Sequence, residues 1–118
     1  MRDYQKLEVW KKAHMMVLFV YSDILPLFLS SERYDLQCQI KRAAYSVPLN
    51  IVEGAGGGSE KDFARFLDMA LGSCQETEYG CLLAKDLAYL NEEKYKEINI
   101  KTNEVKAMLI GLLKRLRQ

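Results

Sequence analysis

The sequence predicts an all-α protein, a four-helix bundle with up-down-up-down topology. Apolar residues recur at spacings of three and four along most of the chain, as they do on one face of an α-helix. Only 7 Gly and 2 Pro interrupt the 118 residues, too few for the many turns of a β-protein. The connections between the apolar stretches are short, which favours antiparallel neighbours, and we expect residues 1–118 to form a single domain.

The first helix is expected from about Gln5 to Leu25, where Pro26 ends it or kinks its last turn. Its core-facing stripe is predicted from spacings of three and four. The members of this stripe are Trp10, His14, Val17, Tyr21 and Ile24. His14 is the single histidine, and its place in the stripe predicts a hydrogen-bonded core imidazole. Lys11 and its neighbours provide the polar outer face.

The second helix is expected to begin near Glu32, with Ser30 or Ser31 as N-cap, and to end within the glycine-rich residues 54–58. Its apolar stripe comprises Leu36, Ile40, Ala43, Val47 and Ile51. Pro48 lies inside this pattern and has no backbone N–H to donate. We therefore expect helix 2 to be kinked near Pro48, and the alternative is a helix that breaks in two one residue earlier.

The third helix is predicted to start after Ser59, an N-cap with Asp62 three residues later. Its core face comprises Phe63, Leu67, Ala70, Cys74, Thr77, Cys81 and Ala88. Asn91 is expected to end this helix and to cap the fourth. The apolar stripe of the fourth helix comprises Ile98, Val105, Leu109, Leu112 and Leu116.

Several classes of functional site lack their residues in this sequence. Three cysteines without a CxxC spacing suit neither a disulfide framework nor a zinc site, and a di-iron bundle would need Glu-x-x-His pairs. The glycine-rich residues 54–59 lack Gly-Lys-Ser/Thr and follow a helix, which excludes a P-loop. We therefore expect no cofactor, no metal, no catalytic residues and no enzyme activity. The polar N-terminus and the lack of a long apolar run predict a cytoplasmic protein that does not enter a membrane.

The middle two helices have too little polar surface for a monomer, because each carries a second apolar stripe. A patch of that size is unusual on a monomer, so homo-oligomerisation through helices 2 and 3 is the simplest remedy. The alternative is a tight bundle with uneven helix tilts. The predicted interface residues are Tyr45, Leu49, Val52, Phe66, Met69, Leu83 and Leu87.

A polar stripe runs between these apolar stripes. Its members are Gln39, Arg42, Ser46, Asn50, Glu53, Ser73 and Glu76. Because buried polar groups are costly unless paired, we expect a bonded network that joins helices 2 and 3, with Glu76 bonded to helix 2. The functional alternative is a pocket here that serves a small-molecule binder or an enzyme.

Three segments resemble the four-helix-bundle family of 23S rRNA intervening-sequence proteins: residues 7–13, residues 39–54 with the pattern Ser-x-x-x-Asn-x-x-Glu-Gly, and residues 63–78. A related group comprises the accessory proteins of diversity-generating retroelements, which form pentameric barrels. The resemblance implies a ring-shaped homo-oligomer, a pentamer, with RNA or a nucleic-acid enzyme as partner. It brings no catalytic residues.

The charge of the chain departs from what this resemblance implies. Family members often carry a basic residue after Glu-Gly, where this chain has Gly56 to Gly58. The whole chain has 17 Lys and Arg and 16 Asp and Glu, so its positive and negative charges nearly cancel. With so little net charge, the chain can bind nucleic acid only if its positive side chains gather on one part of the surface. We therefore expect weak, salt-sensitive and non-specific association. The candidate contacts are Lys41, Lys61, Arg65, Lys114, Arg115 and Arg117, with Arg42 as a further candidate if it is not buried. We favour a non-enzymatic binding scaffold for RNA or a protein over an enzyme.

Overall fold

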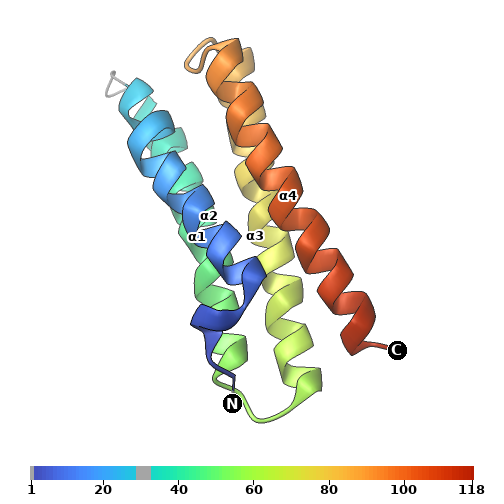
Figure 1. Cartoon of the computed structure of the whole chain (residues 1–118). Helices are drawn as coiled ribbons and strands as arrows, with labels where there is room; N and C mark the ends of the chain where they lie inside the picture. Colours follow the sequence, from blue (N-terminus) through green and yellow to red (C-terminus); the bar gives the residue numbers. More distant parts are fainter. Residues whose placement is uncertain (1, 29–32) are drawn as a thin grey trace.

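The computed structural model describes residues 2–28 and 33–118, and these residues form a four-helix bundle. The four long helices are α1 (Glu8–Phe19), α2 (Tyr34–Ala55), α3 (Glu60–Asp86) and α4 (Glu92–Leu116). In Figure 1 both termini lie at the same end of the molecule as the α2–α3 connection, and the α3–α4 connection lies at the opposite end. No strand occurs in the described residues, so the predicted all-α class with four helices is confirmed.

The first helical segment is more irregular than predicted. A 3-10 turn, η1 (Tyr4–Lys6), precedes α1, and a π-helical turn, η2 (Val20–Ile24), and a second 3-10 turn, η3 (Leu25–Leu27), follow it. Pro26 lies in η3, where the helical run ends. The helical run therefore has nearly the predicted length but not a uniform α-helical pitch.

The face of α1 that packs in the core differs from the predicted stripe. The buried residues are Val9, Ala13, Met16, Val20 and Ile24. Trp10 and Val17 are half-buried and Tyr21 is exposed, so Ile24 is the one member of the predicted stripe that lies in the core. The prediction was wrong because this helix is apolar around most of its circumference, and periodicity alone does not choose between two apolar faces.

His14 is exposed and stacks on the ring of Trp10, with 5.0 Å between the ring centroids and 7° between their planes. The predicted hydrogen-bonded core imidazole is therefore wrong. The error follows from the choice of stripe, because a residue four positions after Trp10 shares its side of the helix.

The second helix passes through Pro48 without a break, so the alternative of two separate helices is wrong. Pro48 itself is buried, as are Ile40, Ala43, Val47 and Ile51 from the predicted stripe. The predicted N-cap at Ser30 or Ser31 and the predicted start at Glu32 lie outside the described residues. The helix ends at Ala55, within the predicted glycine-rich segment.

Two predicted helix caps are confirmed. The Ser59 hydroxyl accepts a hydrogen bond from the Asp62 N–H at 3.1 Å, and the Asn91 side chain accepts one from the Lys94 N–H at 2.8 Å. Each cap satisfies an N–H group that the first turn of a helix leaves without a partner.

The core face of α3 is confirmed except at its last residue. Phe63, Leu67, Ala70, Cys74, Thr77 and Cys81 are buried, whereas Ala88 is exposed and lies beyond the helix. Burial raises the pKa of the Cys74 thiol to about 11 and that of the Cys81 thiol to about 12. Both thiols are therefore poor nucleophiles, as expected of core cysteines.

The third helix ends at Asp86, before the predicted Asn91, because the backbone reverses at Ala88. Ala88 has a φ of 63°, in the left-handed region that favours glycine. Its N–H donates to the carbonyl of Lys85, and the Tyr89 N–H donates to that of Ala84, which together form a Schellman motif. This motif has glycine at the left-handed position in most proteins, so an alanine there gives no sequence signal.

We expect Ala88→Gly to stabilise the protein. Left-handed backbone costs a non-glycine residue about 1–2 kcal/mol, so the variant should gain about 1 kcal/mol in the free energy of unfolding. Urea unfolding followed by circular dichroism measures it. Ala107→Gly is the matched control, because Ala107 is exposed in the middle of α4 and glycine there should lose about 1 kcal/mol. A loss of stability at both positions would contradict the prediction.

Helices α2 and α3 form the most extensive helix pair and approach closely at two glycines. A Cβ added at Gly80 would lie 2.7 Å from Cγ1 of Ile40, and one added at Gly54 would lie 2.8 Å from Cβ of Phe66. Both distances are shorter than van der Waals contact. The two glycines therefore set the distance between α2 and α3 near each end of their shared seam.

The N-terminal residues form a strap across the α2–α3 connection. The Arg2 N–H donates to the carbonyl of Ala55 at 2.8 Å, and the Arg2 guanidinium lies 4.3 Å from the ring centroid of Phe63. The same guanidinium pairs with Glu60 at 3.3 Å. The strap thus binds the last turn of α2 and the first turn of α3.

Candidate functional site

Large apolar side chains lie exposed on helices α2 and α3. Leu49 is 48% exposed and Met69 is 47% exposed. Of the predicted interface residues, Tyr45, Leu49, Met69 and Leu87 are exposed, and Val52, Phe66 and Leu83 are half-buried. These seven residues, called the α2–α3 face below, are therefore at least partly accessible in the single chain. An apolar surface of this kind is typical of a protein interface.

The predicted polar network between α2 and α3 does not form in the single chain. Gln39, Arg42, Glu53 and Glu76 are exposed, and Ser46, Asn50 and Ser73 are half-buried. The Asn50 amide donates to the carbonyl of Ser46 in its own helix, at 2.8 Å. Glu76 is exposed and makes no side-chain hydrogen bond within residues 2–28 and 33–118, so its predicted bond to α2 is absent from the single chain. The prediction assumed that the α2–α3 face is buried, and in the monomer it faces outward.

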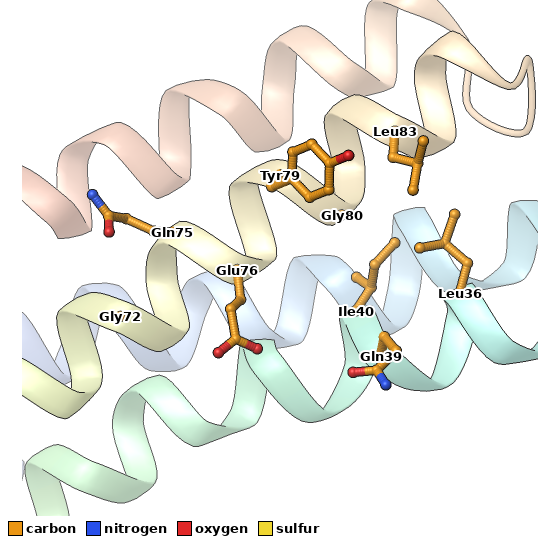
Figure 2. A pocket seen from close by; sticks show the side chains of 9 residues that line it. All are labelled: Leu36, Gln39, Ile40, Gly72, Gln75, Glu76, Tyr79, Gly80 and Leu83. Carbon is orange, nitrogen blue, oxygen red and sulfur yellow. The ribbon is translucent and has the colours of Figure 1, made fainter.

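A cleft of about 470 Å³ lies over the α2–α3 seam. Figure 2 shows Leu83 and Leu36 pointing toward each other across the seam, and Glu76 projecting from α3 toward α2. Gln39 and Glu76 are the members of the predicted polar set that line it, and Leu36, Ile40 and Leu83 make much of its wall apolar. The cleft therefore offers a mainly apolar docking surface with one carboxylate. Such a surface is better suited to binding a protein segment than to catalysis.

The candidate nucleic-acid contacts divide between separate places. Lys61, Arg65 and Arg117 line one cleft of about 370 Å³, together with Asp62 and Asp68. Lys114 is exposed and lines a second cleft with Arg117, and Arg115 is exposed beside the α1–α4 seam. Lys41 is half-buried in a cleft with Tyr21 and Tyr34, far along α2 from the α2–α3 connection. Arg42, the further candidate, is exposed on α2.

Two cations of the Lys61–Arg65–Arg117 cleft are already paired. The Arg65 guanidinium bonds Asp62 at 3.0 Å, and the Arg117 guanidinium bonds both oxygens of Asp68. The hydrogen bonds between Arg117 and Asp68 hold the pKa of Asp68 below its ordinary value and that of Arg117 above its ordinary value. The aspartates thus reduce the positive field that this cleft would present to phosphate.

The Asp68–Arg117 pair should give the stability of the fold a measurable pH dependence. An acid whose pKa is lowered in the folded state stabilises that state above its unfolded pKa, and this contribution disappears as the pH falls through the folded pKa. The wild type should therefore be more stable than Arg117→Gln at neutral pH. This difference should persist down to about pH 4 and vanish at lower pH. Urea unfolding of both chains at neutral pH and below pH 3 measures it, and a difference that grows in acid would contradict it.

Helix α1 carries an exposed apolar surface that the sequence analysis did not identify. Met15 is 59% exposed, and Leu18 and Tyr21 also project into solvent. These three residues, called the α1 face below, are spaced by three: Met15 and Leu18 lie on α1, and Tyr21 lies in the turn η2 that continues it. The signal was present in the sequence as a second apolar stripe, as on α2 and α3, but the lysines at residues 11 and 12 indicated a polar outer face.

Residues 2–28 and 33–118 contain neither a metal-binding cluster nor a membrane-spanning helix. No group of three His, Cys, Asp or Glu side chains gathers there in a way that could hold a metal ion. No helix in this part of the chain is long and apolar enough to cross a membrane.

A family model described as 23S rRNA-intervening sequence protein matches residues 5–111, nearly the whole bundle. The chain belongs to this family. A solved structure of a protein of unknown function, from the S23 ribosomal protein family of Bacteroides thetaiotaomicron, is 27% identical to this family member. The two superpose with a TM-score of 0.83 over 90% of this chain and 98% of that one. No curated protein matches the sequence.

Proposed function

We propose that the chain is a non-enzymatic scaffold that works as a homo-oligomer and holds RNA. The α2–α3 face carries this proposal, because it presents large apolar side chains to water. Full burial of one such side chain is worth about 1.5–3 kcal/mol relative to exposure, so a second copy that covers several of them gains enough to associate. The family resemblance supports a ring of five copies.

Light scattering of the purified wild-type chain tests self-association. We expect a mass several times the 13.6 kDa of one chain at micromolar concentration. A ring of defined size should give a single mass that does not drift with concentration. A clean 13.6 kDa species over the same range would overturn the proposal.

RNA is the proposed partner for two reasons. The solved relative is described as a member of a ribosomal protein family, and Lys61, Arg65 and Arg117 gather around one cleft at the end of the bundle. An oligomer would contain several copies of this cleft, and their positive electrostatic fields would add. Because Arg65 and Arg117 already bond aspartates, the association should be weak and governed by phosphate charge.

Titration of a labelled single-stranded RNA into the protein at two salt concentrations tests this partner. Affinity should fall steeply between about 50 and 200 mM salt and show little sequence preference. Lys61→Gln should weaken binding, whereas Lys96→Gln is the matched control, because Lys96 is exposed near the start of α4 and does not line this cleft. Tight binding that salt does not change would refute a phosphate-governed contact. A lack of binding at low salt would contradict RNA as the partner and would favour a protein partner instead.

A further inference from the structure

The α1 face and the α2–α3 face lie on different sides of the molecule. Helix α1 packs against α2 and α4, and α3 packs against the same two helices, so α1 and α3 occupy opposite corners of the bundle. The buried residues of α1 include Ala13 and Met16, so the α1 face points away from this core. A partner that covers one of these apolar surfaces would therefore leave the other exposed to water.

The cleft on the α2–α3 seam is open to solvent at Gly72. Gly72 lines this cleft, and a Cβ added at Gly72 would meet no atom within 4 Å. The packing of the chain itself therefore does not require glycine there, although glycine inside a helix costs about 1 kcal/mol relative to alanine. Gly72 lies on α3 about one turn before Glu76 (Figure 2), and its lack of a side chain lets another backbone approach closely there.

A lysine beside the α1 face and a glutamate in the cleft carry opposite charges. Glu76 projects into the cleft and has no side-chain bond within the part of the chain that the structure describes. Lys11 lies one turn before Met15 on α1 and is exposed, with Glu8 as its partner at 3.2 Å. Exposed pairs of this kind contribute little, so Lys11 can exchange Glu8 for a carboxylate on another copy at small cost.

We propose that the α1 face of one copy docks in the α2–α3 cleft of the next copy, with Met15 and Leu18 over Gly72 and Lys11 near Glu76. This proposal rests on the self-association proposed above and names its two contact surfaces. Because the two surfaces differ, the contact is head-to-tail: each copy uses α1 toward one neighbour and its cleft toward the other. A contact of this kind continues from copy to copy until the ring closes.

Two surface variants, each damaged on one side, test the head-to-tail contact. Gly72→Lys blocks the cleft and leaves the α1 face intact, and Leu18→Lys damages the α1 face and leaves the cleft intact. Both positions are exposed, and lysine is a better helix former than glycine, so both chains should fold. Each variant alone should be monomeric. Their equimolar mixture should form a dimer of twice the 13.6 kDa chain mass, because one intact cleft meets one intact α1 face.

The other outcomes each have a definite meaning. A wild type that is itself monomeric would overturn the proposed self-association, and this contact with it. A wild type that assembles while the mixture stays monomeric would overturn the head-to-tail contact alone. Assembly of Leu18→Lys as in the wild type would also overturn it, because the occupant of the cleft would then be another surface. Ile100→Lys, on the exposed side of α4, is the control and should assemble normally.

Discussion

Leu49→Lys should convert the proposed homo-oligomer into single chains of 13.6 kDa that remain helical. Leu49 is about half exposed in the single chain, so lysine there disturbs little of the bundle core and should change the stability of one chain by less than about 0.5 kcal/mol. In an assembly the same lysine would place a charge in an apolar interface, where it has no partner. Met69→Lys should act in the same way from α3.

Light scattering and far-ultraviolet circular dichroism, measured on the same samples, separate dissociation from unfolding. The mass should fall to that of one chain while the helical signal stays near that of the wild type. Ile100→Lys provides the matched control, because Ile100 is 66% exposed on α4 and belongs to neither proposed surface. Loss of helix together with mass would mean that Leu49 supports the fold itself, and an unchanged mass would remove Leu49 from the interface.

Gly54→Ala should strongly destabilise the bundle. The added Cβ would lie 2.8 Å from Cβ of Phe66 and 3.0 Å from Cδ1 of Phe63. The Phe66 atom is fixed to the backbone of α3, so α2 and α3 must separate to admit the methyl group. Overpacking of this kind costs about 1–3 kcal/mol, although alanine is otherwise the better helix former.

Gly111→Ala is the matched control for this substitution. Gly111 lies inside α4, and a Cβ there would meet nothing within 4 Å, so this variant should gain up to about 1 kcal/mol. Urea unfolding of the three chains compares them at equal protein concentration, since self-association would otherwise shift the apparent stability. A gain of stability in Gly54→Ala would contradict the prediction, because it would mean that α2 and α3 leave enough space for a methyl group at this point.

The features that could be predicted from the sequence are those that local chemistry specifies. Ser59 and Asn91 cap their helices through their own side chains, and Ile40, Ala43, Val47 and Ile51 of the predicted α2 stripe are buried. The end of α3 was missed because Ala88 adopts a left-handed conformation without a glycine to indicate it. The turn η2 was missed because a π-helical turn has no pattern that distinguishes it from α-helix.

The candidate site was harder to predict because exposure is a tertiary property. Periodicity placed Leu49 on a second apolar stripe of α2 and Met69 on one of α3, and both residues are exposed. It did not show that Glu76 lies on the outer surface, since the choice of buried face depends on how neighbouring helices pack. On α1 the apolar residues surround the axis so fully that Trp10 and Ala13 were equally good candidates for the core.

The strap formed by Arg2 fixes the direction from which any added polypeptide leaves the bundle. Arg2 is tied to Ala55 and Glu60, and both chain ends lie at the end of the bundle that holds the α2–α3 connection (Figure 1). A tag or fluorescent domain fused ahead of Arg2 and another fused after Gln118 would therefore emerge at the same end of the bundle. Energy transfer between two such labels should be strong within one folded chain and should collapse on unfolding. The opposite end, at the α3–α4 connection, would stay clear for attachment to a surface.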